Sequence, residues 1–437
     1  MSAKRDLPRE YEVEIDRLSH EGRGVARFAG KAVFVADALP GEQVVARVTR
    51  RHRRYDEAAT LTILRADPAR VTPRCPHAAQ CGGCSLQHLD PGAQLQHKQS
   101  VLLEFLRHQA NVIPAVVLPP TTGSLWGYRR RARLSVRVVP KKGGVLIGFR
   151  EKSSHYVTDI SHCAVLIPSV GERLPALRAM VEGLSIREHI PQIEVAADDA
   201  ITLLLIRQLA PPSTADLERL RAFEHVTGLY IYLQAGNVAS SVPVSVPVSL
   251  QYRLDDLVFA FQPGDFVQVN AEINRKLVAQ ALALLAPAAN DQILDLFCGL
   301  GNFTLPIARQ VSRVVGIEGE AGLVARAQAN AHANHLQNVE FQQADLFSAA
   351  GVARAAAQSY DKILLDPPRS GAEEVLRALD LSATRRIVYV SCNPVTLARD
   401  AAILTRDRGF RLCAAGIIDM FPHTSHVESI AVFEPAR

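Results

Sequence analysis

The sequence predicts an α/β protein, and a glycine turn between two apolar runs is the first reason. The run Ile293–Leu296 leads to the turn G-L-G-N at residues 299–302, after which the composition is that of a helix start. A second apolar run, Val314–Ile317, follows and ends in Glu318. Strand, glycine turn, helix and acid-ended strand form the layout of a nucleotide-type site on a parallel sheet. The C-terminal part of the chain is therefore predicted to be Rossmann-like.

Further apolar runs extend this predicted sheet. Each has the length of a buried strand and is bounded by turn residues. A helix is expected over Ala271–Leu285, just before the sheet begins, and an alanine-rich helix is expected after Glu318. The expected later strands are Asn338–Phe341, Asp361–Leu365, Ile387–Val390, a strand near Ile417, and Ile430–Phe433.

Length and composition predict a folded, soluble protein of two or three domains. The chain has 437 residues, of which 48% are hydrophobic and 21% charged. No apolar run approaches the roughly twenty residues of a membrane span. The start, Met1–Asp6, lacks the apolar core of a signal peptide, so we expect a cytoplasmic protein without a membrane partner.

The positive charge is concentrated in two arginine-rich stretches, although the net charge is only +5. Such stretches can be solvated faces, but two in one chain favour an anionic polymer as partner. The first stretch contains Arg47, Arg50, Arg51, Arg53 and Arg54, and the second contains Arg129, Arg130, Arg131, Arg133 and Arg137.

Three domains are predicted: residues 1–68, 69–261 and 262–437. In the first, expected strands at Lys31–Val35 and Gln43–Val48 flank the turn Pro40-Gly41. Short strands between glycine and proline turns indicate an OB-like barrel. The central domain is expected to be rich in strands, with alternate arginines between Arg129 and Arg137 on one strand face. The proline-containing repeat at residues 241–249 is expected to be an edge or linker.

Three cysteines fall within ten residues in the pattern C-x5-C-x2-C. In a reducing compartment, clustered thiolates indicate a metal site before a disulfide. Zn²⁺ and an iron–sulfur cluster both take four such ligands, so spacing leaves the metal open. The expected ligands are Cys75, Cys81, Cys84 and Cys163, with His77 or His162 as alternatives in a Cys3His zinc site.

The turn sequence also indicates which cofactor the C-terminal domain binds. G-L-G-N differs from the G-x-G-x-x-G of dinucleotide sites, which disfavours a pyrophosphate ligand. S-adenosylmethionine has a ribose and no phosphate, and it fits better. Glu318 is positioned to accept hydrogen bonds from ribose hydroxyls, and Asp345 is expected near the adenine.

The residues after the later strands indicate pyrimidine chemistry. Asp366-Pro367-Pro368 is followed by Arg369, where methyltransferases of exocyclic base amines typically carry a stacking aromatic residue. Cys392 follows the next strand. C5 of a pyrimidine is a poor nucleophile, and addition of a thiolate to C6 makes C5 able to attack a methylsulfonium. The C5 proton must then leave to a base, for which Glu428 is the candidate. Cys298 and Cys413 are expected to be packing thiols.

These motifs resemble those of the RNA uracil-5-methyltransferase family: Cys392 in S-C-N-P, Asp366 in D-P-P-R, and F-P-x-T-x-H-V-E ending at Glu428. Residues 21–27 and 38–42 resemble a TRAM domain, an RNA-binding module. The branch with both TRAM and four cysteines methylates a uridine of 23S ribosomal RNA. The resemblance implies a [4Fe-4S] cluster on the four cysteines named above. It implies S-adenosylmethionine contacts from Gln268, Phe297, Asn302, Glu318, Asp345 and Asp366.

The expected partner is therefore 23S ribosomal RNA or a ribosomal assembly intermediate, and the expected state is a monomer. A bifunctional or tRNA-directed enzyme is an alternative within the same family. A non-catalytic RNA-binding assembly factor is the alternative from another class, although such a factor needs neither Cys392 nor Glu428.

Overall fold

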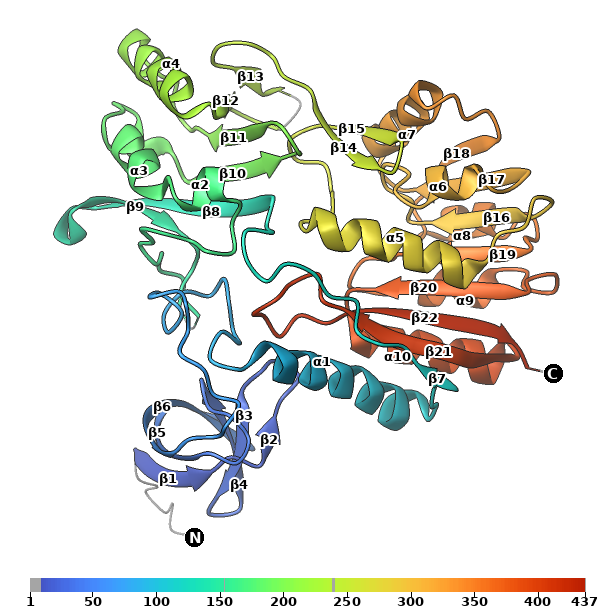
Figure 1. Cartoon of the computed structure of the whole chain (residues 1–437), viewed down its shortest axis with the longest axis horizontal. Helices are drawn as coiled ribbons and strands as arrows, with labels where there is room; N and C mark the ends of the chain where they lie inside the picture. Colours follow the sequence, from blue (N-terminus) through green and yellow to red (C-terminus); the bar gives the residue numbers. More distant parts are fainter. Residues whose placement is uncertain (1–8, 153, 238–239, 437) are drawn as a thin grey trace. The chain divides into compact units, whose positions relative to one another are not determined.

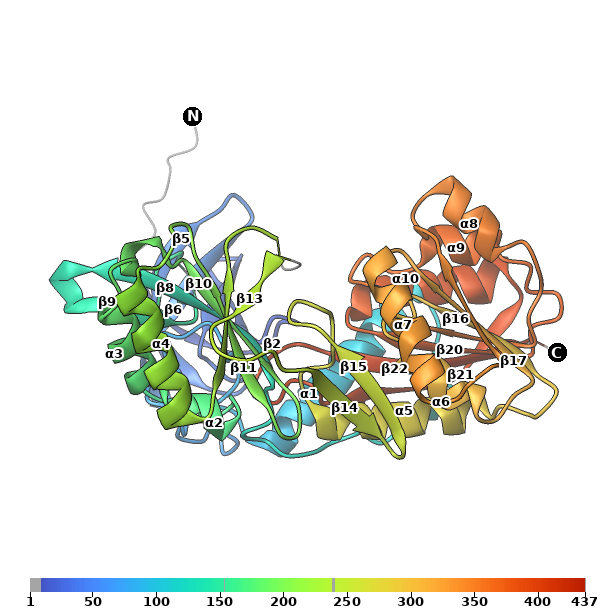
Figure 2. The same cartoon turned by 90° about the horizontal axis from the view of Figure 1, so that it is seen from above.

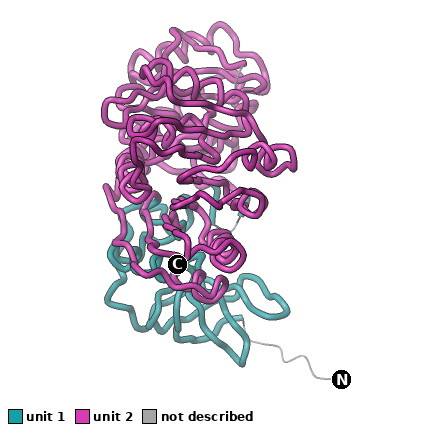
Figure 3. The backbone as a smooth tube through the Cα atoms, turned by 90° about the vertical axis from the view of Figure 1, so that its right-hand side faces the viewer, with its two compact units in different colours: residues 1–101, 150–155, 421–426 teal, residues 102–149, 156–420, 427–437 magenta. Residues whose placement is uncertain are grey.

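The computed structural model describes residues 9–152, 154–237 and 240–436, so the stretch Met1–Asp6 lies outside the described residues. The chain forms two compact units (Figure 3). Unit 1 comprises Met1–Val101, Arg150–His155 and Phe421–His426, and unit 2 comprises Leu102–Phe149, Tyr156–Met420 and Val427–Arg437. Within the described ranges, no helix is both long and apolar enough to cross a membrane.

Unit 1 begins with a six-stranded sheet that curls around its own core (Figure 1). Tyr11 and Val13 are buried while the glutamates between them are exposed, which is the period-2 pattern of a half-buried strand. The strands are β1 (Glu10–Glu14), β2 (Arg17–Leu18), β3 (Gly24–Phe28), β4 (Lys31–Ala36), β5 (Gln43–Arg51) and β6 (Tyr55–Arg65), in the order β1-β5-β6-β4-β3-β2. The predicted all-β module is present.

The remainder of unit 1 includes the cysteine-rich segment and helix α1 (Pro91–Phe105) as far as Val101. The carboxylate of Asp90 accepts from the amides of Gly92 and Ala93, which caps the start of this helix. Val101 is the last residue of α1 in unit 1, and the helix continues into a π-helical turn at Leu106–Ala110 in unit 2.

The first sheet of unit 2 has the order β13-β12-β11-β10-β8-β9. Residues 140–143 form the turn of the β8–β9 hairpin. Val242–Pro243 is the edge strand, as predicted for a proline-containing segment. The elements are β8 (Arg131–Val139), β9 (Gly144–Gly148), α2 (Pro168–Gly171), α3 (Leu174–Glu182), β10 (Gln192–Ala197), β11 (Thr202–Arg207), α4 (Thr214–Thr227), β12 (Tyr230–Gln234) and β13 (Val242–Pro243).

The second sheet of unit 2 has eight strands in the order β18-β17-β16-β19-β20-β22-β21-β7. Figure 2 shows α8, α9 and α10 on one face of it and α5 and α6 on the other. The strands are β7 (Val116–Val117), β16 (Gln292–Leu296), β17 (Arg313–Glu318), β18 (Val339–Gln343), β19 (Lys362–Leu365), β20 (Arg386–Ser391), β21 (Phe410–Ile418) and β22 (Glu428–Pro435). The helices are α5 (Ala271–Leu285), α6 (Thr304–Ala308), α7 (Ala321–Ala333), α8 (Ala349–Ala355), α9 (Glu373–Ala378) and α10 (Pro394–Ala402), and a separate hairpin consists of β14 (Leu250–Leu254) and β15 (Leu257–Phe261).

The strand directions place several ends at one edge of this sheet. Strands β16 to β20 are parallel, whereas β22 runs antiparallel to β20. The carboxyl ends of the parallel strands therefore meet the amino end of β22. The strand order reverses between β16 and β19, where open α/β sheets bind their ligands. We call this edge the rim.

Candidate active site

The glycine turn at the rim contains a strained residue. Phe297, directly after β16, has a φ of 63°, a left-handed conformation that is an outlier for an aromatic residue. Gly299 and Gly301 also have positive φ, at 56° and 88°. Backbone strain of this kind persists where the surrounding structure enforces it and is common at ligand sites.

Glu318 at the end of β17 fastens this turn. Its carboxylate accepts from the amide of Gly299 at 3.1 Å and from the amide of Glu320 at 3.0 Å. The predicted ribose-binding acid thus also orders the glycine turn, and it stands one strand away from Phe297.

Asn302 is held by two residues that the sequence analysis missed. Its side-chain oxygen accepts from the Tyr252 hydroxyl and from the Asn274 amide, both at 3.0 Å, and its amide donates to Asn274 at 3.0 Å. Burial raises the pKa of Tyr252 well above its ordinary value, so the hydroxyl remains a donor. Tyr252 and Asn274 lie 50 and 28 residues away in the chain, and no local motif indicated them.

Asp295, within β16, is also a residue that the motifs did not single out. It is 0% exposed, its Oδ2 accepts from the Thr304 hydroxyl, and its Oδ1 has no hydrogen-bond partner among the described residues. Burial raises its pKa to about 7, the Thr304 hydrogen bond acts against this, and the charge of Glu318 adds to it. An acidic residue in the strand that leads into a cofactor-binding turn is the sequence signal that could have indicated Asp295.

Asp345 follows β18 and is exposed, and its Oδ1 accepts from the amide of Phe347 at 3.0 Å. The ring of Phe347 is 44% exposed and lies 5.7 Å from the ring of Phe297, centroid to centroid. Two aromatic rings beside a carboxylate that accepts from N–H groups form a surface suited to a flat base.

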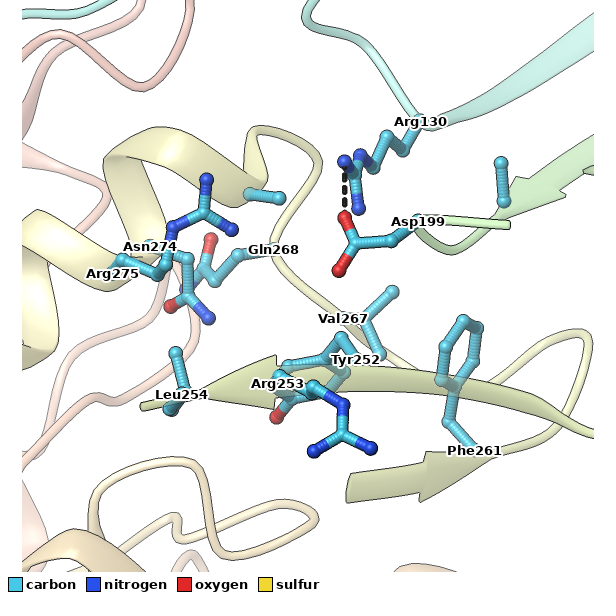
Figure 4. A pocket seen from close by; sticks show the side chains of 12 residues that line it. Arg130, Asp199, Tyr252, Arg253, Leu254, Phe261, Val267, Gln268, Asn274 and Arg275 are labelled. Carbon is cyan, nitrogen blue, oxygen red and sulfur yellow. Dashed lines mark ion pairs between the residues drawn. The ribbon is translucent and has the colours of Figure 1, made fainter. Parts of the chain in front are cut away.

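Gln268 lines a separate pocket in unit 2 (Figure 4). The pocket has three guanidinium groups, and Arg130 forms an ion pair with Asp199 at 2.6 Å. Apolar and aromatic side chains complete the wall. The lining residues include Arg130, Asp199, Tyr252, Arg253, Phe261, Val267, Gln268, Asn274 and Arg275. Because Tyr252 and Asn274 also bind Asn302, the pocket adjoins the turn.

The S-C-N-P motif explains how Cys392 is presented. Asn393 caps α10 by accepting from the Val395 amide, and Pro394 occupies the first helical turn. The Asn393 side chain also donates to the carbonyl of Arg369 at 3.0 Å. Cys392 is thereby fixed between the end of β20 and a helix start, and the D-P-P-R segment is attached to the same cap.

The charged groups that shift the pKa of Cys392 include Glu428, the predicted base. Burial raises its pKa to about 12, the charges of Glu428 and Asp366 add to the rise, and Arg369 acts against it. The Cys392 thiol is therefore neutral in the free protein. Burial and then the charges of Glu428 and Asp295 also raise the pKa of Asp366.

The two other cysteines of this domain differ from each other. Cys298 is 3% exposed, which agrees with a packing thiol. Cys413 is only partly buried, and its Sγ lies 3.5 Å from the Glu434 carboxylate. A register shift between Leu412 and Ala414 leaves Cys413 outside the β21–β22 ladder, so this thiol is packed only in part.

The four cysteines of the expected metal site belong to different units. Cys75, Cys81 and Cys84 are in unit 1, and Cys163 is in unit 2. The amide of Gly83 donates to Cys81 Sγ at 3.4 Å, a contact of the kind that stabilises a ligating thiolate. Among the described residues, however, no three His, Cys, Asp or Glu side chains are grouped as a metal site. Four thiols are chemically suitable ligands for an iron–sulfur cluster, but the described residues are not grouped around a metal position.

The second arginine-rich stretch is partly neutralised. Arg131 and Arg133 both bind Glu194, at 2.9 Å and 3.0 Å, and side chains alternate along β8 as predicted. With the Arg130–Asp199 pair, three of the five arginines already have carboxylate partners. In the first stretch, Arg50, Arg53 and Arg54 are exposed near the β5–β6 turn.

Comparison with solved structures identifies the fold. The crystal structure of the Pyrococcus abyssi tRNA (uracil-54, C5)-methyltransferase in complex with S-adenosyl-L-homocysteine matches with a TM-score of 0.75 at 24% identity. The match covers 97% of this chain and 100% of that one. The two chains therefore share one fold over nearly their whole length.

The family follows from the sequence comparisons. The family model described as tRNA (Uracil-5-)-methyltransferase matches residues 92–435, and the TRAM domain model matches residues 5–60. The chain belongs to the tRNA (uracil-5-)-methyltransferase family and carries a TRAM domain.

Among similar proteins is the 23S rRNA (uracil(1939)-C(5))-methyltransferase RlmD of Alkalilimnicola ehrlichii, 53% identical over 436 residues, 99% of this chain and 98% of that protein. RlmD of Hahella chejuensis is 51% identical over 443 residues, with 99% of each chain covered. RlmD of Stenotrophomonas maltophilia is 51% identical over 430 residues, with 97% of each covered. The RlmD type is the branch that the TRAM module and the cysteines had predicted.

Proposed function

We propose that this chain methylates C5 of a uridine in 23S ribosomal RNA, with S-adenosylmethionine as methyl donor. The observation that carries the proposal is Cys392 at the end of β20, under the charges of Glu428 and Asp366. This arrangement occurs in a chain that is 51–53% identical to RlmD proteins over nearly its whole length. A tRNA-directed or bifunctional activity is the alternative within the family.

The rim residues would hold S-adenosylmethionine. Glu318 would accept from the ribose hydroxyls, and Asp345 with the rings of Phe297 and Phe347 would hold the adenine. The cofactor supplies an electrophilic methyl group when bound. The remaining proposed contacts are Gln268, Asn302 and Asp366, which surround the same turn or line the pocket beside it.

Cys392 would act as the nucleophile. Because its pKa of about 12 leaves the free thiol neutral, the thiol proton must pass to solvent as Sγ bonds to C6 of the uracil, and solvent returns it when Sγ is expelled. Arg369, whose charge lowers this pKa, favours that step. The base must be extruded from its stack for Sγ to reach C6.

Glu428 would remove the C5 proton after methylation. Expulsion of Sγ then restores the C5–C6 double bond, and the thiolate regains a proton. The net loss per turnover is one proton, that of C5, which passes through Glu428 to solvent. The antiparallel direction of β22 supports this role, because it brings the first residue of that strand to the rim.

The TRAM domain and the arginines support an RNA partner. Arg253 and Arg275 in the pocket have no ion pair within the part of the chain that is described, so they are available for phosphate or base contacts. A non-catalytic assembly factor would not need the Cys392–Glu428 arrangement. We also propose a cytoplasmic monomer of three domains, with boundaries near residues 68 and 261.

A structural [4Fe-4S] cluster on Cys75, Cys81, Cys84 and Cys163 is part of the proposal. Thiolate donors and the Gly83 amide beside Cys81 support it. Anaerobically purified protein should be brown and contain about four irons and four sulfides per chain. Stoichiometric zinc without sulfide would contradict the cluster.

The main test is incubation with labelled S-adenosylmethionine and unmodified 23S RNA, with a tRNA transcript as the matched control. We expect one or more 5-methyluridines in the ribosomal RNA and none in the tRNA. RNA containing 5-fluorouridine should trap the wild-type enzyme covalently, because fluorine cannot leave as a proton. Glu428→Gln should methylate C5 and then remain bound to RNA through Cys392. A Glu428→Gln enzyme with wild-type turnover would move the base elsewhere, first to His426 or a water.

A further inference from the structure

The loop that precedes Glu428 is held by residues that follow the cysteine-rich segment. We call residues Phe421–His426 the pre-base loop, and they belong to unit 1. The carbonyl of His423 accepts from the amide of Ser85 at 3.0 Å and from the amide of Leu86 at 2.9 Å. A segment some 330 residues earlier in the chain therefore fixes this loop.

Gln94, on α1, joins the same two segments through its side chain. It is 3% exposed. Its Oε1 accepts from the His423 amide at 2.9 Å, and its Nε2 donates to the carbonyls of Leu86 at 3.0 Å and Leu89 at 2.8 Å. With these bonds, Gln94 satisfies its amide and ties the backbone of the pre-base loop to the segment after Cys84.

Two more polar side chains hold the ends of the pre-base loop. Ser85 Oγ accepts from the amide of Ser425 at 2.8 Å. Lys98, which is 1% exposed, donates to the carbonyl of Phe421 at 2.9 Å. The loop thus has backbone attachments at its first, third and fifth residues, all to residues 85–98.

The backbone of His423 shows why so many attachments are present. His423 has a φ of 65°, a conformation that a residue with a side chain seldom adopts. Such a conformation persists only when its surroundings enforce it, and Gln94 and residues 85–86 bond to both peptide groups of His423.

The attachments matter because Glu428 is the first residue of β22. Ser429 is registered opposite Ser391 of β20, and the Ser429 hydroxyl donates to the Ser391 carbonyl at 3.3 Å. Glu428 pairs with Ile418 of β21 and precedes the β20 ladder. Glu428 is therefore held in register on the β21 side only, and its direction also depends on the backbone that enters the strand, which begins two residues after the pre-base loop.

We propose that Gln94 is a positioning residue for C5 deprotonation: it fixes the pre-base loop so that Glu428 enters β22 in one orientation. This rests on the proposed function of Cys392 and Glu428. Loss of the Gln94 hydrogen bonds lets the pre-base loop move, so Glu428 is less often in position to accept the C5 proton. Addition of Cys392 to C6 depends on β20 and α10 and is unaffected.

The expected signature is a slow release step. Gln94→Met keeps the side-chain length and removes the hydrogen bonds. We expect adduct formation at the wild-type rate and decay of the methylated adduct slowed about 10²-fold, the size of effect that a displaced catalytic group produces. Gln99→Met is the matched control, because Gln99 is on the same helix and its buried amide has no partner among the described residues.

The experiment follows the RNA-linked enzyme on denaturing gels after rapid mixing of full-length protein, S-adenosylmethionine and a 23S RNA fragment. The Gln94→Met adduct should persist, the Gln99→Met adduct should decay like wild type, and Gln94→Met should add nothing to Glu428→Gln. Equal slowing of adduct formation and decay, or unchanged decay, would overturn the proposal.

Two milder variants keep the test decisive if Gln94→Met does not fold. Gln94→Glu retains the acceptor for the His423 amide, and Ser85→Ala removes only the bond to Ser425, so each should slow adduct decay less than Gln94→Met. Wild-type decay in both would refute the positioning role. Failure of the proposed function is distinct: wild-type enzyme would then form no adduct with 5-fluorouridine RNA.

Discussion

Two buried carboxylates, one in each unit, have opposite surroundings. Glu42 in unit 1 and Asp295 at the rim in unit 2 are both 0% exposed. Glu42 accepts two hydrogen bonds from Arg70 and one from the Leu39 amide. Burial alone would raise its pKa, but these bonds and the Arg70 charge outweigh it, so the pKa of Glu42 is lowered. Asp295 has one hydroxyl donor and a raised pKa.

Buried titratable groups are compensated differently in the scaffold of unit 1 and at the rim of unit 2. In unit 1, a buried charge is paired with an opposite charge, or a buried group stays neutral, as for His88, whose pKa burial lowers to about 4. At the rim, burial and neighbouring carboxylates raise the pKa values of Asp295, Asp366 and Cys392 together. Several titratable groups with perturbed pKa values at one sheet edge are characteristic of a functional site rather than of a scaffold.

The largest expected effect is at the rim. Cys392→Ala should reduce methylation by about 10⁴-fold or more, because the covalent route is lost, and should abolish the RNA adduct. Cys413→Ala is the control, since that thiol lies on β21 beside Glu434 of β22, and we expect wild-type activity. Residual adduct in Cys392→Ala, detected on denaturing gels, would show that another nucleophile acts.

The corresponding change in unit 1 should affect stability. Glu42→Gln leaves Arg70 without its charge partner and should lower the free energy of unfolding by about 3 kcal/mol. The lowered pKa of Glu42 means that its contribution is present above the unfolded pKa, near about 4.3, and is lost as pH falls further. Urea titrations at neutral and acidic pH should show the difference shrinking below about pH 4, and a constant difference would argue against the ion pair.

Asp295→Asn should change the free energy of unfolding in the opposite direction and stabilise the protein at high pH. A folded pKa of about 7, raised from 3.8, means that the folded state binds more protons than the unfolded state between these values, so this group lowers stability as pH rises. Removing the charge should recover up to about 4 kcal/mol at pH 8, offset by about 1–3 kcal/mol for the unpaired amide. Urea titrations from pH 4 to 8 would measure this. A variant less stable than wild type at pH 8 would show that the charge of Asp295 does not destabilise the folded state.

The smallest expected effect concerns the exposed arginines of unit 1. Replacing Arg53 and Arg54 with alanine should weaken RNA binding several-fold and lower the salt dependence of log Kd by up to about two. Arg65→Ala is a control, because Arg65 already binds Glu14 at 2.9 Å. Filter binding at several salt concentrations tests this, and an unchanged salt slope would remove these arginines from the RNA contact.

The sequence by itself determined the local structure and the chemical types of the site residues. Periodicity predicted α5 at Ala271–Leu285 and the strands of the second sheet of unit 2, because helix and strand patterns repeat over a few residues. The motifs around Cys392 and Glu428 predicted the methylation chemistry, and the comparisons confirmed that function. The roles of the individual site residues stay predictions.

The tertiary structure decided which of these residues act on one another. The insertion of β22 between β20 and β21 brings the charge of Glu428 to bear on Cys392, and no local pattern specifies that order. Arg131 and Arg133 are a second case. The sequence predicted that they contact RNA, whereas in the folded chain both form ion pairs with Glu194. Gln94 and His423 are 329 residues apart in the chain. Burial, pKa and hydrogen-bond partners depend on such long-range contacts, and these form only when the chain folds.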